Sequence, residues 1–337
     1  MLGHIRAITT DSASVNIKMI QILEKSLKSF NATDAHIRCM AHVINLGAQK
    51  LLDNLKATAT DNETMDENSI APPDISGVLW RVRRIVIKVR ALNLIWEAQV
   101  SAAKLPSLHL ILDMRVRWNS THDMLNRFIQ LRPAIHAICQ IESSLLPYRL
   151  SNDDWNILIG LRSCLDTFIK ATEHLSGSTY PTLSSQLPYF IVLASRLEGQ
   201  INAMKSKDPA NILIPALNAA WVKLDEYHSR TGSAQAIATI LDPRYKLTAL
   251  RNLSWTEPWI ETARLSIERI YDTQYAPLPI DKPTTPEGSN EEDIEDDFIQ
   301  AVFGSSQGSL VSTSGPSQLE VYLDEPVEGR KVYKPLP

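Results

Sequence analysis

The sequence contains few cysteines and no long apolar run. Only three of its 337 residues are cysteine (Cys39, Cys139 and Cys164), and their odd number and wide spacing argue against a disulfide scaffold and favour a reduced, intracellular protein. No stretch approaches the roughly 20 consecutive apolar residues of a membrane-spanning helix, so we expect no membrane partner. Residues 1–10 lack the apolar core of a signal peptide. The P-loop, the dinucleotide fingerprint and the nucleophile elbow are also missing.

Charge is spread unevenly along the chain, although the formal net charge is only −4. Residues 78–137 contain ten Lys and Arg against three Asp and Glu, a net charge of +7, whereas residues 276–337 contain four against twelve, a net charge of −8. Because the local field decides whether a surface attracts nucleic acid, the middle of the chain is a candidate DNA-binding region despite the acidic total.

Hydrophobic periodicity predicts short strands at the start of the chain and helices through its middle. We expect strands over residues 5–10 and 36–40, and the clearest helix over 78–103. Two segments, 57–77 and 276–318, are rich in acidic residues and proline and bury too little apolar surface to offset chain entropy. Further helices are expected over residues 17–30, 42–56, 119–139, 154–175, 184–205, 211–227, 234–241 and 257–271.

Several short motifs follow one another in a fixed order. The first is Ile-Thr-Thr-Asp-Ser-Ala-Ser-Val-Asn (8–16), in which an apolar strand ends on Asp11. It is followed by Arg-Cys-Met-Ala-His (38–42), Arg-Trp-Asn-Ser-Thr (117–121), Thr-Tyr-Pro-Thr (179–182) and Leu-Asp-Pro-Arg-Tyr-Lys (241–246). Each motif is weak alone, but in this order they resemble the hAT superfamily of DNA transposases, of the type associated with BED zinc fingers.

The resemblance implies a fold of class α/β plus α. It would comprise a partial RNase H-like core, a large, mainly α-helical insertion domain and a disordered acidic tail, with the family pattern truncated at both ends. The expected segments are a core over 1–56, a linker over 57–77, the helical insertion domain over 78–275, a disordered acidic and Ser/Gly-rich linker over 276–318, and a remnant of the C-terminal dimerisation region over 319–337. A homodimer through that last segment and a nuclear location follow from the same resemblance.

The resemblance also implies catalytic residues, of which this sequence matches only part. Transposases of this kind use carboxylates that hold a pair of Mg²⁺ ions, and one of three expected carboxylates is present, at Asp11. His42 would lie beside that site. We therefore expect an ancestral metal role for Asp11, no cofactor bound by this chain and no catalysis. The alternative for Asp11 is a loop residue that caps the following helix, and Cys39 with His42 lacks the further ligands of a zinc site.

DNA contacts are expected at two places. The resemblance gives Arg117 a phosphate contact and Trp118 a stacking contact with an unpaired base; the alternative is that Trp118 anchors the core, and we expect it to be partly buried with one ring edge accessible. Arg81, Arg84 and Lys88 share one face of the helix expected over 78–103, where they would either bind phosphates or be a solvated face.

The sequence thus favours a transposase-derived DNA-binding protein that is catalytically inactive. Two other hypotheses stay open. One is a regulatory or protein-interaction helical module that does not bind DNA. The other is a truncated gene model of an active transposase.

Overall fold

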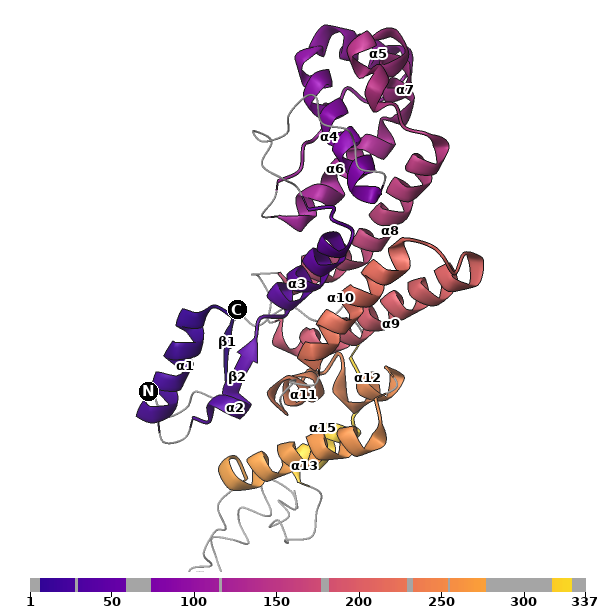
Figure 1. Cartoon of the computed structure of the whole chain (residues 1–337). Coiled ribbons are helices and arrows are strands. Elements are labelled where there is room, and N and C mark those ends of the chain that lie inside the picture. The colour runs from indigo at the N-terminus through magenta and orange to yellow at the C-terminus, as the bar shows by residue number, and fades with distance from the viewer. Residues whose placement is uncertain are drawn as a thin grey trace, which may run out of the picture. The chain divides into compact units, whose positions relative to one another are not determined.

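The computed structural model describes residues 7–27, 30–58, 74–114, 117–176, 182–228, 233–253, 255–276 and 317–328. Contacts divide the chain into two compact units, the first reaching Asp242 and the second running from Pro243 to Tyr333. The described residues are mostly helical, with one small two-stranded sheet (Figure 1). The predicted helical content is therefore confirmed, whereas a sheet of this size does not establish an RNase H-like core.

The small sheet lies at the start of the first unit. Strands β1 (Ile8–Thr10) and β2 (His36–Arg38) pair in parallel, with Thr10 opposite Arg38. Parallel strands need a crossover connection, which here contains helix α1 (Ser14–Ser26) and the short α2 (Ala32–Ala35). Immediately after β2 the chain enters helix α3 (Met40–Asn54), so that the carboxyl ends of both strands lie close to the start of this helix.

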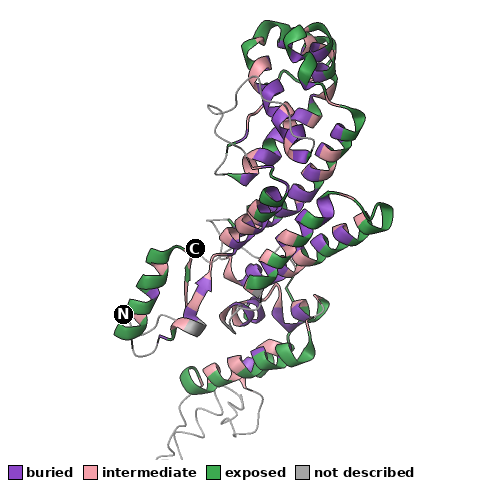
Figure 2. Cartoon of the chain, in the orientation of Figure 1, coloured by how far each residue is buried: buried purple, intermediate pink, exposed green. Residues whose placement is uncertain are grey.

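Helices make up the rest of the first unit, and their buried residues run along the sides that face one another (Figure 2). The long helix α8 packs against α3, α6 and α9, and α10 packs against α3 and α9. The elements are α4 (Ile75–Ala91), α5 (Asn93–Ala102), α6 (Trp118–Gln130), α7 (Arg132–Ile141), the 3₁₀ helix η3 (Ser143–Tyr148), α8 (Asn152–Leu175), α9 (Leu183–Lys207), α10 (Leu213–His228) and α11 (Ser233–Ile240).

Two helices that the periodicity predicts as continuous are each broken in the structure. The helix expected over 78–103 is interrupted at Leu92, whose backbone leaves helical geometry with φ −107° and ψ 37°. The helix expected over 119–139 is interrupted at Leu131, just before Pro133. Proline has no N–H to donate to the preceding turn, and so it sits in the first turn of a new helix. Apolar periodicity continues across both breaks and therefore does not reveal them.

Helix α3 belongs to the helical array, although the sequence assigns it to the predicted core over 1–56. A Cβ atom added to Gly47 would lie 3.0 Å from Leu224 Cδ2 on α10 and 3.3 Å from Phe168 Cε1 on α8. Glycine thus allows the three helices to approach closely. The division between compact units falls at Asp242 rather than within residues 57–77, because α3 completes the core of the helices that follow it.

A buried ion pair connects α4 to the segment that precedes α6. Arg83 Nε and Nη2 donate to Asp113 Oδ1 and Oδ2 at 2.9 and 2.7 Å, and the two residues are only 3% and 5% exposed. Arg83 Nη2 also donates to the carbonyl oxygen of Ala57, and Thr121 Oγ1 donates to Asp113 Oδ2 at 2.9 Å. Four separate parts of the chain therefore meet at one buried, hydrogen-bonded charge pair.

The second unit contains helices α12 (Lys246–Asn252), α13 (Glu257–Gln274) and α15 (Gln318–Asp324). Most of α13 is exposed (Figure 2), and its buried residues are Ile260, Ala263 and Ile267. Most of the two predicted linkers, at 59–73 and 277–316, lies outside the described residues, as does 329–337 of the predicted dimerisation remnant. Among the described helices none is both long enough and apolar enough to cross a membrane.

We predict that Asp113→Ala lowers the free energy of unfolding by about 3–5 kcal/mol, because it leaves the buried guanidinium of Arg83 without a counter-charge. The measurement is urea denaturation followed by circular dichroism. Glu226→Ala is the matched control, since it removes a carboxylate that pairs with Lys223 on the surface and is expected to cost at most about 1 kcal/mol. Equal effects of the two changes would contradict a special role for the buried pair.

Candidate functional site

Asp11 lies directly after β1, where its carboxylate holds the start of α1. Its Oδ1 accepts hydrogen bonds from the backbone N–H of Ala13 at 3.0 Å and from Asn16 Nδ2 at 2.6 Å. These two bonds, the backbone one first, hold the pKa of the exposed Asp11 carboxyl below its ordinary value. The geometry is that of a side chain which stabilises the first turn of a helix.

Polar side chains from both strands surround this position. Thr10 Oγ1 and His36 Nε2 are 2.7 Å apart, and Arg38 Nη1 donates to Ser12 Oγ at 2.9 Å. Burial, followed by the nearby charge of Arg38, lowers the pKa of His36. The cluster therefore connects β1 and β2 through side chains as well as through the backbone, from the start of β2 at His36 to its end at Arg38.

His42 lies in the first turn of α3 and is close enough to Asp11 to act on its charge. It makes the smallest of the contributions that lower the Asp11 pKa. Cys39, half-buried, precedes α3, and its backbone N–H donates to the Thr10 carbonyl oxygen at 2.7 Å. The two residues that the resemblance marks as catalytic, Asp11 and His42, are thus brought to the same end of the sheet.

These residues alone do not fit a two-metal centre. In the described part of the chain no group of three or more His, Cys, Asp and Glu side chains is arranged to hold a metal ion. Mg²⁺ prefers near-octahedral oxygen ligands, and two ions bridged for phosphodiester chemistry need several carboxylates. Asp11 offers one carboxylate, and one of its oxygens already accepts two hydrogen bonds.

The predicted DNA-contacting pair Arg117 and Trp118 is divided between surface and core. Trp118 is 4% exposed and meets Phe168 edge-to-face, with ring centroids 6.0 Å apart. The expectation that one ring edge of Trp118 is accessible is therefore wrong, because the indole closes the gap between α6 and α8. Arg117, one residue earlier, is exposed.

Ser120 fixes the loop that carries Arg117. Its hydroxyl accepts a hydrogen bond from the backbone N–H of Met114 at 2.7 Å and lies 2.6 Å from the Arg117 carbonyl oxygen, to which it can donate. Met114 and Arg117 also form an antiparallel bridge. Ser120 of the Arg-Trp-Asn-Ser-Thr motif thus joins Met114 to Arg117, and Trp118 anchors the residue after Arg117 in the core.

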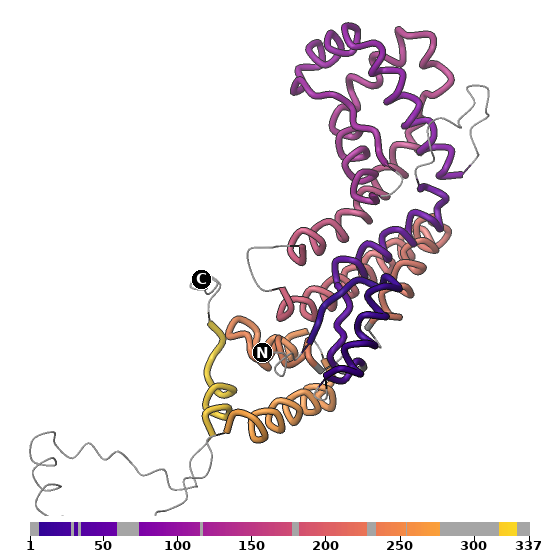
Figure 3. The backbone as a smooth tube through the Cα atoms, turned by 90° about the vertical axis from the view of Figure 1, so that its left-hand side faces the viewer, coloured from indigo at the N-terminus to yellow at the C-terminus, as the bar shows by residue number. Residues whose placement is uncertain are grey.

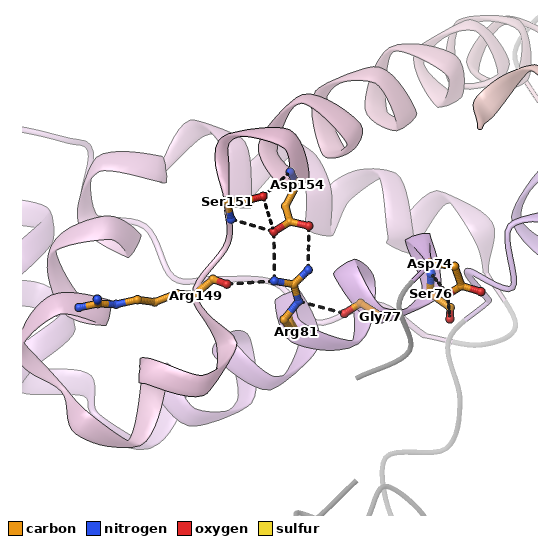
Figure 4. Close-up of polar contacts among 7 residues, drawn as sticks. All are labelled: Asp74, Ser76, Gly77, Arg81, Arg149, Ser151 and Asp154. Atoms are coloured by element: carbon orange, nitrogen blue, oxygen red, sulfur yellow. Dashed lines mark hydrogen bonds and ion pairs between the residues drawn. The ribbon is translucent and has the colours of Figure 1, made fainter. Parts of the chain in front are cut away.

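Arg81 faces the protein interior, where it joins α4 to the start of α8 (Figure 4). Its guanidinium makes two hydrogen bonds to Asp154, at 2.7 and 3.0 Å, and donates to the Arg149 carbonyl oxygen at 3.0 Å. Asp154 also accepts from the N–H and hydroxyl of Ser151, which completes a capping box at the start of α8. Burial alone raises the pKa of Asp154, but the hydrogen bonds from Ser151 and Arg81 outweigh it and lower the pKa below its ordinary value.

The other two cations of the predicted basic face also pack against protein. Arg84 is 7% exposed, with its guanidinium 5.5 Å from the centre of the Trp80 ring, and Lys88 Nζ lies 5.7 Å from the centre of the Tyr148 ring. Sequence reasoning missed the acidic partners Asp113 and Asp154. The signal that could have found them was the apolar setting of Arg81 and Arg83, since cations flanked by valine and isoleucine on a buried helix need counter-charges. DNA contact by Arg81, Arg84 and Lys88 stays a prediction.

A cavity of about 710 Å³ lies beside the Arg81–Asp154 pair. Its apolar lining includes Ile75, Val78 and Ile157, and the guanidinium and carboxylate on its wall are bonded to each other.

The geometry defines a helical scaffold that carries a polar cluster at the end of a small parallel sheet. Residues 37–164 match the model of the ZBED1 RNase-like helical domain. The chain is 29% identical over 306 residues to the "Putative transcriptional regulator tpeD" of Talaromyces stipitatus, which covers 82% of this chain and 33% of that relative. It is 24% identical over 254 residues to the "Putative AC transposase" of Zea mays, with 71% of this chain and 28% of the relative covered.

A further relative is the "Zinc finger BED domain-containing protein RICESLEEPER 1" of Oryza sativa subsp. japonica, 24% identical over 321 residues, 87% of this chain and 40% of the relative. The chain therefore spans about a third of the length of these relatives. No solved structure matches it. The resemblance to hAT-family, transposase-derived proteins that the motifs predict is therefore confirmed.

We predict that Trp118→Ala lowers the free energy of unfolding by about 3–5 kcal/mol, as truncation of a large aromatic side chain in a core does. Chemical denaturation of the variant and the parent measures this. Trp259→Ala is a matched control, because that indole is 61% exposed. A Trp118 variant as stable as the parent would show that the ring does not support the core.

We predict that Asn16→Ala raises the pKa of Asp11 but leaves it below the ordinary value, because the backbone bond from Ala13, which has the larger effect on this pKa, remains. A lowered carboxyl pKa means that the stabilisation is complete above the ordinary pKa and is lost as the pH falls through the lowered one. The measurement is an NMR titration of the Asp11 carboxyl carbon. Asn202→Ala, on the exposed side of α9, should leave the titration unchanged, and an ordinary pKa in the parent would mean that the bonds from Ala13 and Asn16 do not hold the Asp11 carboxylate.

Proposed function

We propose that this chain is the scaffold of a transposase-derived, DNA-binding protein that acts in the nucleus, and that it does not cleave DNA by itself. The observation that carries the proposal is the position of Arg117. This cation is exposed on a loop inside the segment that matches the helical domain model, residues 37–164. The relatives named as transposases and BED zinc-finger proteins support a nucleic-acid partner.

The loop around Arg117 is suited to a fixed phosphate contact. The hydroxyl of Ser120 binds backbone on both sides of the loop, and Trp118 is held in the core. A guanidinium on a braced loop loses little freedom when it meets a phosphate. Each phosphate neutralised releases counterions, so that such binding weakens as salt rises.

The same proposal assigns no cofactor and no reaction step to this chain. Its support is the position of Asp11, which is a single carboxylate whose hydrogen bonds hold α1. His42, in the first turn of α3, would then support the polar cluster and not a reacting group. Homodimerisation through residues 319–337 is part of the proposal as a prediction from the family resemblance.

The alternative function is a regulatory or protein-interaction module without DNA binding. One observation favours it: Arg81 and Arg83, two of the cations in the basic middle of the chain, are paired with Asp154 and Asp113. The relative named as a transcriptional regulator also covers 82% of this chain. The two functions differ in whether exposed cations such as Arg117 meet DNA.

We predict that the chain binds double-stranded DNA weakly and with steep salt dependence, and that Arg117→Ala reduces the slope of log K against log salt by about 1, the value for one lost phosphate contact. Fluorescence anisotropy with a labelled duplex at several salt concentrations measures both. Arg196→Ala is the matched control, since this arginine is exposed on α9.

The result separates the two functions. Binding that weakens in Arg117→Ala and not in Arg196→Ala supports a DNA contact at the loop. Absence of binding at about 50 mM salt, where electrostatic contacts are strong, would reject DNA binding and favour the protein-interaction module.

A further inference from the structure

Lys246, the last residue of the Leu-Asp-Pro-Arg-Tyr-Lys motif, is a buried cation. It is 2% exposed and lies at the start of α12. Its Nζ donates to the carbonyl oxygens of Tyr322 at 2.8 Å and Glu325 at 3.0 Å, and it lies 3.4 Å from Glu325 Oε2. The same ammonium group lies 4.2 Å from the centre of the Tyr322 ring. All these partners come from α15 and the residue that follows it.

Placing a lysine here has a cost in free energy. An ammonium group removed from water must regain hydrogen bonds and a compensating negative potential. The backbone of Lys246 also has φ 48°, in the left-handed region that residues other than glycine, asparagine and aspartate seldom adopt. The contacts with α15 offset both costs, so the conformation of Lys246 makes sense only with α15 in place.

The C-terminal end of α15 requires hydrogen-bond donors and positive charge. The last carbonyl groups of a helix lack partners within the helix, and they carry the negative end of its dipole. Lys246 supplies donors and a positive charge at that position. At the other end of α15 a capping box formed by Ser317 and Glu320 satisfies the first turn. The two devices fix both ends of this seven-residue helix.

Further contacts hold the same segment. The backbone N–H of Glu328 donates to the Pro243 carbonyl oxygen at 2.9 Å, and Leu319 is 7% exposed. Asp324 is near enough to Arg264 on α13 to raise the pKa of that guanidinium, after the larger effect of Glu268. Figures 1 and 3 show α15 beside α13. Pro243 and Lys246, three residues apart, thus bind the chain on both sides of Glu325.

We propose that the Pro243–Lys246 turn is a docking site for the C-terminal end of a helix, and that α15 is its occupant. The site recognises two backbone carbonyl groups, an aromatic face and a carboxylate, here supplied by Tyr322 and Glu325. Residues 277–316 separate α13 from α15 in the sequence, and α15 is too short to be stable as an isolated helix. The position and the helical structure of α15 therefore depend on Lys246.

The test is hydrogen exchange by mass spectrometry on the full chain. Lys246→Met keeps the length of the side chain and removes its charge and donors. It should speed amide exchange in residues 318–325 about 10- to 100-fold, the size expected for loss of charge-assisted hydrogen bonds. Exchange in α8 should not change. Lys246→Arg, which keeps the charge but has a planar group in place of a compact one, should have a smaller effect.

Lys205→Met is the matched control, because Lys205 is exposed on α9; it should leave α15 protected. Tyr322→Leu should cause an intermediate loss of protection, since the carbonyl contacts remain and the aromatic face is lost. Unchanged protection of α15 in Lys246→Met would overturn the proposal. So would an equal loss of protection in α13, which would mean that Lys246 supports the whole second unit and does not specifically dock α15.

Discussion

The buried ion pair between Arg83 and Asp113 is the constraint on which the first unit depends. A guanidinium and a carboxylate can lie in an apolar interior only if each hydrogen-bonding position is occupied. Meeting that condition brings together α4, the residue Ala57 after α3, the segment before α6, and Thr121 within α6. The pair links these elements at defined atoms, whereas the surrounding aliphatic side chains contribute non-directional burial.

The loop that carries Arg117 follows from the same pair. Asp113 fixes where the chain approaches α6, and Ser120 closes the turn between Met114 and Arg117. Trp118 then enters the core against Phe168 while Arg117 stays outside. The motif, in which the resemblance gives DNA contacts to Arg117 and Trp118, therefore divides into one candidate contact at Arg117 and neighbouring residues that hold it in place.

The net charge of residues 78–137 overestimates the size of the basic surface. The helix that bears Arg81, Arg83 and Arg84 has positive residues on more than one face, but α8 and the segment before α6 bring carboxylates to two of them. The candidate interface is thus smaller than the net charge of +7 over residues 78–137 suggests. The second unit shows the same principle at Lys246, where the compensating groups are backbone carbonyls and an aromatic ring.

The sequence by itself determined the resemblance to hAT-family proteins, the helical nature of the chain and the positions of most helices, because these depend on local periodicity and on the order of short motifs. The family resemblance also placed His42 beside Asp11, and the parallel pairing of β1 and β2 in the structure accounts for this position. Only the tertiary structure decided that α3 completes the helical core, that Trp118 is buried, and that Arg81, Arg83 and Lys246 have partners 73, 30 and 76 residues away. The physical reason is that a buried charge selects its partner by position in space, and no local pattern in the sequence records that choice.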